Sequence, residues 1–179
     1  MSKKSKKKEQ APVNDIRIYQ YNPCWVETYE KQVKRLQERL PKRIKARFMH
    51  VGSTAVPGCY TSGDMDIALG IESPLDLITV RDVLLVNGYK YDQKHSALHH
   101  YVVTRAINGT LTVIVHIVCI GNPIWEDMYI FKDHLLRHND VRDKYSDLRF
   151  QMTKIPNLSL DDYELEKRKF QKEIIRKLK

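Results

Sequence analysis

Two aspartates, Asp64 and Asp66, stand two residues apart at the start of an otherwise apolar segment. In an extended strand, side chains at this spacing point to the same face, so the two carboxylates are predicted to lie side by side. Like charges at that distance repel and raise a pKa unless a cation compensates them. The hard divalent cations Mg²⁺ and Mn²⁺ prefer such oxygen ligands, and the pair therefore predicts a metal site.

A phosphate-binding turn is predicted just upstream, at Gly52-Ser53-Thr54. Glycine lets backbone N–H groups approach a phosphate closely, and the serine hydroxyl adds a further donor. A phosphate cradle opposite a pair of metal ligands is the equipment for phosphoryl or nucleotidyl transfer. Each motif by itself also occurs in ordinary turns and strand ends, so a capping or solvent-facing role stays open for both.

Histidine and basic side chains supply the remaining candidates. His116 is the main ionisable residue of the apolar segment 111–120, where it can serve as a metal ligand, a general base or a hydrogen-bonded core residue. Lys132 and Arg137 fall near one face of a predicted helix, where phosphate contact and a structural ion pair with Asp133 are both open.

The hydropathy pattern predicts the elements that hold these residues. Alternation predicts strands, apolar residues at steps of three and four predict helices, and Asn108-Gly109 predicts a hairpin turn. The predicted strands are residues 16–21, 65–71, 101–107 and 111–120, and the predicted helices are residues 25–40, 75–87, 125–138, 141–153 and 160–178. This order is typical of one α+β domain with a helical C-terminal portion.

Composition bounds the class of protein. The chain has 179 residues, of which 42% are hydrophobic and 30% charged, as is typical of a globular domain. No apolar run reaches the ~20 residues that a membrane helix needs, and no secretory signal follows the N-terminal lysines, so no membrane partner is expected. Cys24, Cys59 and Cys119 lack a CxxC spacing, which favours a reduced, cytoplasmic protein.

The net charge of +9 is concentrated at the N-terminus. Five lysines lie among the first eight residues, and without them the net charge falls to +4. We expect residues 1–14 to form a disordered basic tail and residues 15–179 to form the domain. Such a tail can bind RNA through its phosphates, and a purely solubilising role stays open.

The string HVGSTAVPG at residues 50–58, followed by the aspartate pair, resembles the GrpB family, a branch of the nucleotidyltransferase superfamily that contains DNA polymerase beta-like enzymes. The resemblance extends from about residue 15 to the C-terminus. Its other matches are Tyr21, Pro23, Trp25, Tyr29, residues 115–118, residues 131–137, Tyr145, Leu148, Tyr163, Lys167 and Phe170. It implies a nucleotidyltransferase-like mixed β-sheet flanked by helices.

The resemblance also implies how the roles are divided. The implied phosphate-binding residues are Gly52, Ser53, Thr54, Lys132 and Arg137. Asp64 and Asp66 would hold Mg²⁺ or Mn²⁺, and His116 would orient or deprotonate the acceptor. A third carboxylate completes the metal site in that superfamily. Segment 111–120 contains none, and Glu72 and Asp92 are the open candidates.

The implied reaction transfers a nucleoside monophosphate from a nucleoside triphosphate, with ATP as the first candidate, to a hydroxyl. The alternative is a non-catalytic module that binds a nucleotide or RNA and keeps the fold, because a fold alone does not determine an activity.

Overall fold

The computed structural model describes residues 16–109 and 111–179. Within this part of the chain, a five-stranded mixed sheet has the strand order β1-β2-β5-β4-β3. The strands are β1 (Ala46–Val51), β2 (Met65–Ile71), β3 (Lys90–Tyr91), β4 (His100–Ile107) and β5 (Leu111–Cys119). β2 and β5 pair in parallel, whereas the other neighbouring strands pair antiparallel.

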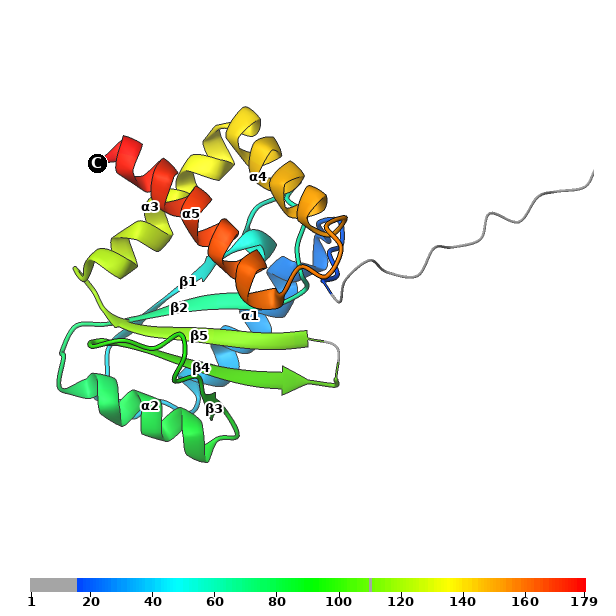
Figure 1. Ribbon diagram of the computed structural model, residues 1–179. Coiled ribbons are helices and arrows are strands. Elements are labelled where there is room, and N and C mark those ends of the chain that lie inside the picture. Colours follow the sequence, from blue (N-terminus) through cyan, green and yellow to red (C-terminus); the bar gives the residue numbers. More distant parts are fainter. Residues whose placement is uncertain (1–15, 110) are drawn as a thin grey trace, which may run out of the picture.

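Helices cover both faces of this sheet (Figure 1). They are α1 (Cys24–Gln37), α2 (Asp76–Val86), α3 (Pro123–Arg137), α4 (Asn139–Met152) and α5 (Leu160–Leu178), together with the short 3₁₀ helix η1 (Ser53–Ala55). The crossover between the parallel strands β2 and β5 contains α2, β3 and β4, which is long enough to return the chain in the same direction.

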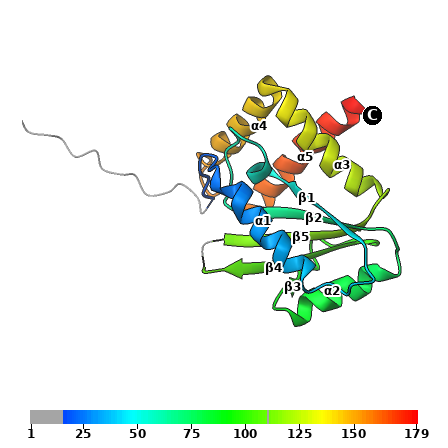
Figure 2. The ribbon, with the colours of Figure 1, turned by 180° about the vertical axis from the view of Figure 1, so that it is seen from behind.

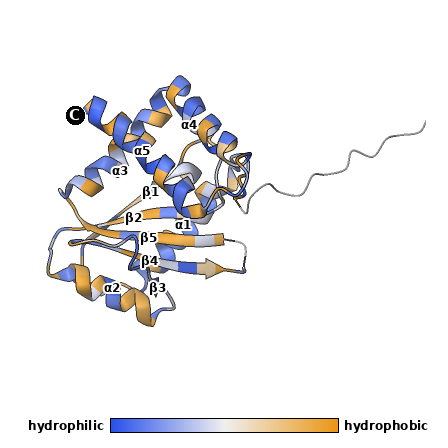
Figure 3. Cartoon of the chain, viewed as in Figure 1, coloured by the Kyte–Doolittle hydropathy of each residue, from blue (hydrophilic) through white to orange (hydrophobic). Residues whose placement is uncertain are grey.

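One face of the sheet forms the main hydrophobic core with α1 and α2. Ile67 and Leu69 of β2 and Val115 of β5 are fully buried there, against Leu36 of α1 and Val80 of α2. Figure 2 shows α1 lying across this face, and Figure 3 shows the hydrophobic character of β2 and β5. Because side chains alternate along a strand, the even-numbered residues of β2 and β5 point to the opposite face.

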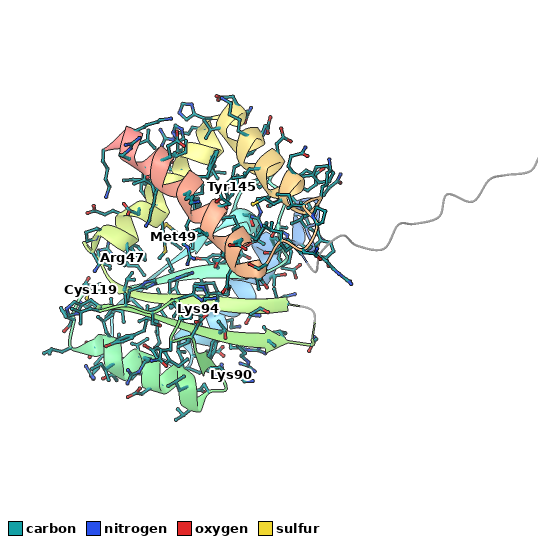
Figure 4. All side chains as sticks on the ribbon, in the orientation of Figure 1. Arg47, Met49, Lys90, Lys94, Cys119 and Tyr145 are labelled. Atoms are coloured by element: carbon teal, nitrogen blue, oxygen red, sulfur yellow. The ribbon has the colours of Figure 1, made fainter. Side chains whose placement is uncertain are left out.

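The C-terminal helices α3, α4 and α5 form a layer beside that opposite face (Figure 1). Phe131, Leu135 and Tyr145 build a second hydrophobic core within it, and Figure 4 shows Tyr145 between the helices. Val56 and Cys59, from the loop after η1, pack into the same core. The loop that follows β1 is therefore held in place by the C-terminal helices.

The even-numbered face is closed at one end and open at the other. At the closed end, a Cβ on Gly70 would lie 2.7 Å from Cζ3 of Trp125, so the indole of α3 covers β2 directly. Arg47 and Met49 of β1 lie on the same face (Figure 4). At the other end of β2, the side chain of Asp66 is 27% exposed, which leaves it accessible to a ligand.

Most of the predicted elements are confirmed, with boundaries that differ by a few residues. The strand predicted at residues 16–21 is wrong, because the segment makes one isolated antiparallel bridge, between Tyr19 and Thr61, before α1 begins at Cys24. The two-residue strand β3 was not predicted, since alternation cannot be recognised over so short a segment. The predicted basic tail, residues 1–14, lies outside the described residues.

None of the helices in the described part of the chain combines the length and the apolar character that crossing a membrane requires.

Candidate functional site

The aspartate pair lies where β1 ends and β2 begins. Val51, the last residue of β1, pairs in register with Asp66, and Asp64 comes directly before the first residue of β2. The turn Gly52-Ser53 therefore starts beside the Asp66 carboxylate. The antiparallel pairing of β1 with β2 brings together the two motifs that the sequence predicted, and the partly exposed side chain of Asp66 faces the open end of the sheet.

Position 52 requires a glycine, because the Asp66 carboxylate occupies the space that a side chain would fill. Its φ of +71° is favourable for glycine and strained for other residues. A Cβ at this position would lie 2.2 Å from Oδ2 of Asp66, well inside the closest approach that two such atoms tolerate. The absence of a side chain thus lets the carboxylate pack against the backbone of the turn.

Asp64 has a pKa that its surroundings raise above the ordinary value of an aspartate. Burial raises the pKa of its carboxyl, and the neighbouring negative charge of Asp66 raises it further. Hydrogen bonds from the hydroxyls of Ser62 and Thr112 and the positive charge of Lys167 act in the opposite direction. Two partly buried carboxylates whose repulsion is incompletely compensated are an environment that favours a divalent cation.

His116 completes the site from the neighbouring strand. It pairs in register with Ala68, and its Nε2 lies 3.3 Å from Oδ1 of Asp66. Its Nδ1 lies 3.2 Å from Nε2 of His100, whose ring stacks on that of His116. Burial, and then the neighbouring His116, lower the pKa of His100 to about 4, so His100 is neutral near pH 7. The sequence indicated His100 only as part of a separate cluster with His95 and His99, and its place beside His116 was not predicted, because the cross-strand pairing of β4 with β5 decides it.

Two lysines of the helical layer carry positive charge toward this part of the molecule, Lys167 near Asp64 and Lys132 near His50. Lys167 of α5 has a side chain that is 16% exposed, pairs with Glu164 at 2.7 Å and lies close enough to Asp64 to favour its ionised form. Lys132 of α3 is half-buried, and burial lowers its pKa. Its charge contributes to lowering the pKa of His50 to about 4, after the larger effect of burial.

Lys167 was not predicted as a site residue. It belongs to the apolar-and-basic repeat of α5, and one helical turn separates it from the buried Tyr163, over whose ring its Nζ lies at 5.1 Å from the centroid. That spacing indicates a lysine whose stem follows a buried face. This four-residue spacing is the feature of the sequence from which an inward-pointing Lys167 could have been predicted.

Two of the predicted phosphate contacts lie elsewhere. Thr54 is fully buried, and its Oγ1 lies 3.0 Å from Nε2 of His50, so its hydroxyl holds that histidine instead of facing a ligand. Arg137 is exposed and pairs with Asp133 at 2.9 Å, one helical turn away, which fits the structural alternative considered for it. Ser53 is 6% exposed and keeps its place in the turn beside Asp66.

The two open candidates for a third carboxylate are not brought to the pair. Glu72 follows the last residue of β2, at the opposite end of the strand from Asp64. Asp92 is held by His95, whose Nδ1 lies 2.7 Å from its Oδ2. Among residues 16–109 and 111–179, no three histidine, cysteine or acidic side chains converge into a preformed metal site.

The residues present nevertheless fit a divalent cation that is shared with a ligand. The donor set contains two carboxylates, and one of them is seated where a glycine leaves room for it. Mg²⁺ is commonly bound by one or two carboxylates while substrate phosphates and water complete its coordination. Asp64 and Asp66 would hold such a cation, and the turn at Gly52-Ser53 would face its phosphates.

Comparison with solved structures defines the class of the fold. The Cid1 poly(U) polymerase with Mg 3′-dATP bound superposes with a TM-score of 0.51 at 12% identity, over 73% of this chain and 41% of that chain. This chain thus spans less than half of the Cid1 chain. At this identity the likeness shows the fold, which is a nucleotidyltransferase-like mixed sheet with flanking helices.

The chain belongs to the GrpB family, whose model, described as GrpB protein, matches residues 15–177. The GrpB protein of Enterococcus faecalis has a crystal structure that superposes with a TM-score of 0.76 at 21% identity, over 90% of this chain and 99% of that chain. A UPF0157 protein of Streptomyces coelicolor is 26% identical over 149 residues, which is 83% of this chain and 76% of that protein.

Proposed function

We propose that this protein is a nucleotidyltransferase that transfers a nucleoside monophosphate from a nucleoside triphosphate to a hydroxyl, with a divalent cation. The observation that carries the proposal is the seating of the Asp66 carboxylate against the backbone of Gly52, with Asp64 beside it. This arrangement places a pair of carboxylates that suits a cation directly against the turn proposed to bind the phosphates. The likeness of the fold to Cid1, a poly(U) polymerase, supports the same class of reaction.

The described residues divide the work of such a reaction. Asp64 and Asp66 hold the cation, and the backbone of Gly52 and Ser53 with the serine hydroxyl binds the β- and γ-phosphates. Lys132 and the inward-pointing Lys167 offset the negative charge of the triphosphate. A bound Mg²⁺ or Mn²⁺ would neutralise the phosphates and polarise the acceptor oxygen. ATP is the first candidate nucleotide.

The bond changes are those of any nucleotidyl transfer. The acceptor oxygen bonds to the α-phosphorus, and the bond from that phosphorus to the bridging oxygen of pyrophosphate breaks. The hydroxyl proton leaves to water, and pyrophosphate is released. A triphosphate held between the turn and the aspartates would have its α-phosphorus positioned for this attack. Proximity of the reacting atoms and stabilisation of the developing charge would then lower the activation barrier.

Calorimetric titration with ATP and the other nucleoside triphosphates, with and without Mg²⁺, tests the site. We expect cation-dependent binding to wild type that falls by about two orders of magnitude in the double variant Asp64→Asn/Asp66→Asn, because the cation loses its anchoring charges. The matched control is Asp143→Asn/Asp147→Asn, which removes the same charge from two exposed positions on α4. Equal affinity of wild type and the Asp64/Asp66 variant would refute the assignment.

A second candidate function is a binding module without catalysis, which keeps the fold for a nucleotide or RNA. The observation that favours it is that no third carboxylate joins Asp64 and Asp66 among the described residues. Pyrophosphate release discriminates the two functions. Cation-dependent nucleotide binding with release of pyrophosphate, when small hydroxyl compounds, proteins and RNA are supplied as acceptors, supports the enzyme. The same binding with no release under any of these conditions supports the module.

A further inference from the structure

His116 and Asp66 meet where β5 runs parallel to β2. His116 pairs in register with Ala68, which lies two residues after Asp66 on β2. Its side chain is therefore on the same face of the sheet as Asp66. Its Nε2 lies 3.3 Å from Oδ1 of Asp66, and its side chain is 20% exposed. A carboxylate oxygen and an imidazole nitrogen thus point toward each other at a partly accessible position.

The other ring nitrogen of His116 is held by a buried neighbour. Its Nδ1 lies 3.2 Å from Nε2 of His100, and the two ring centroids are 5.4 Å apart with nearly parallel planes. His100 is 9% exposed. Histidines that bind metals usually have their second ring nitrogen hydrogen-bonded, which fixes the orientation of the ring. When His116 donates its Nδ1–H to His100, the lone pair of its Nε2 faces Asp66.

The two oxygens of Asp66 face different partners. Oδ2 lies against the backbone of Gly52, whereas Oδ1 faces His116. Along the strand, Asp64 lies on one side of Asp66, and His116, level with Ala68, lies on the other. Asp66 therefore has a carboxylate neighbour in one direction and an imidazole neighbour in the other. The two directions offer a cation different kinds of ligand.

We propose that Asp66 and His116 form a mixed oxygen–nitrogen position for a transition-metal dication, so that this chain favours such an ion over Mg²⁺. The proposal deepens the proposed function, on which it rests for the presence of a cation. Mg²⁺ takes oxygen ligands, whereas imidazole suits Zn²⁺, Fe²⁺, Ni²⁺ and Cu²⁺. Mn²⁺ also binds well to oxygen ligands, and it serves here as the paramagnetic probe of the transition series because a nitrogen ligand to it is detected directly. Phosphate oxygens and water complete the coordination, and the position therefore needs no third protein ligand, in keeping with the described residues.

Pulsed electron paramagnetic resonance of Mn²⁺ bound to the full chain tests the nitrogen ligand directly. Spectra are recorded with Mn²⁺ alone and with Mn²⁺ and ATP. We expect a coupling to a directly bound nitrogen in wild type, which changes to the ¹⁵N pattern when the protein is labelled with ¹⁵N-histidine. This labelling leaves the fold untouched, so the test does not depend on a variant.

Two variants then identify the histidine. The coupling should be lost in His116→Asp, which restores an all-oxygen donor set. It should persist in His50→Gln, because Nε2 of His50 is held by Thr54 and its ring stacks on Tyr29. The concentration of Mg²⁺ needed to displace Mn²⁺ should fall about tenfold in His116→Asp, since the ligand that discriminates against Mg²⁺ is gone.

The outcomes separate this inference from the proposed function. Nitrogen coupling that is absent in wild type under both conditions, or that survives in His116→Asp, overturns the inference, even if nucleotides bind with Mg²⁺. Nitrogen coupling from His116 in a protein that binds no nucleoside triphosphate supports the inference and refutes the proposed function. If Mn²⁺ does not bind with or without ATP, the inference fails.

Discussion

At the scale of single residues, the candidate site depends on steric room as much as on charge. Gly52 leaves space for the Asp66 carboxylate, and Asp66 in turn contacts His116. Burial and repulsion raise the pKa of Asp64 at the same place. A glycine, two acids and a histidine thus determine one another's positions, and a change in any one of them is felt by the others.

Replacing Gly52 by alanine should therefore harm both stability and binding. Gly88→Ala is the matched control, because Gly88 has a φ of +85° but nothing within 4 Å of its added Cβ. We expect about 1 kcal/mol of destabilisation in the control, from backbone strain alone, and about 2–3 kcal/mol in Gly52→Ala, where the methyl also displaces Asp66. Urea unfolding measures both. Equal destabilisation, with cation-dependent nucleotide binding intact in Gly52→Ala, would contradict the packing argument.

His50 should make stability depend on pH. Burial lowers its pKa from an ordinary 6.5 to about 4, so the folded protein holds it neutral between these values while the unfolded chain binds a proton. The free energy of unfolding therefore falls as the pH is lowered from about 7 to about 4. In His50→Gln this contribution is missing, and wild type should lose up to roughly 3 kcal/mol more than the variant over that range.

Urea unfolding of both proteins at several pH values checks the difference. The other histidines are common to both chains, so their contributions cancel in the comparison. Parallel pH profiles would show that His50 titrates alike in the folded and unfolded states.

At the scale of elements, the contact of α3 with β2 closes one end of the face that carries the site. Gly70 of β2 lies under the indole of Trp125, and an added Cβ would also lie 2.8 Å from Cγ1 of Ile120. No positive φ is involved at Gly70, so the requirement for glycine there comes from packing. Since α3 also carries Lys132, this contact helps to position that lysine, whose charge acts on His50.

Gly70→Ala should cost about 2–3 kcal/mol of stability, because the methyl forces the indole or β2 to move. In a Trp125→Leu background the same methyl should cost at least about 1 kcal/mol less, since the smaller side chain leaves it room. Thermal or urea unfolding of the two single variants and the double variant measures this coupling. Strict additivity would mean that the indole does not press on Gly70 in solution.

At the scale of the whole molecule, the site is assembled from parts that are distant along the chain. The turn after β1 supplies Gly52 and Ser53, the start of β2 supplies the two aspartates, β5 and β4 supply two histidines, and α5 supplies Lys167. The loop between β3 and β4 is linked to the start of α5, because Lys94, which lies in front of β5 in Figure 4, pairs with Asp161.

The basic N-terminal segment should act independently of that assembly. Deleting residues 1–8 removes five lysines, and we expect it to weaken the binding of single-stranded RNA and to reduce the slope of log K against log [salt] by about 2 to 3. Replacing the same five lysines by glutamine keeps the length and should give the same loss. Nucleotide affinity should not change. RNA binding that keeps its salt dependence after the deletion would locate the RNA contacts in the domain.

Local patterns in the sequence determined much of this protein. The period of the hydropathy pattern predicted β2, β5 and the helices, because periodicity acts within a few positions. The types and spacing of Gly52, Asp64 and Asp66 marked them as candidates for one site, and the structure brings Gly52 and Asp66 into contact. The tertiary structure alone decided that His116 meets both Asp66 and His100, and that Lys167 lies near Asp64 in particular. Those contacts depend on strand order, register and helix packing, and no local pattern records which distant segments will pair.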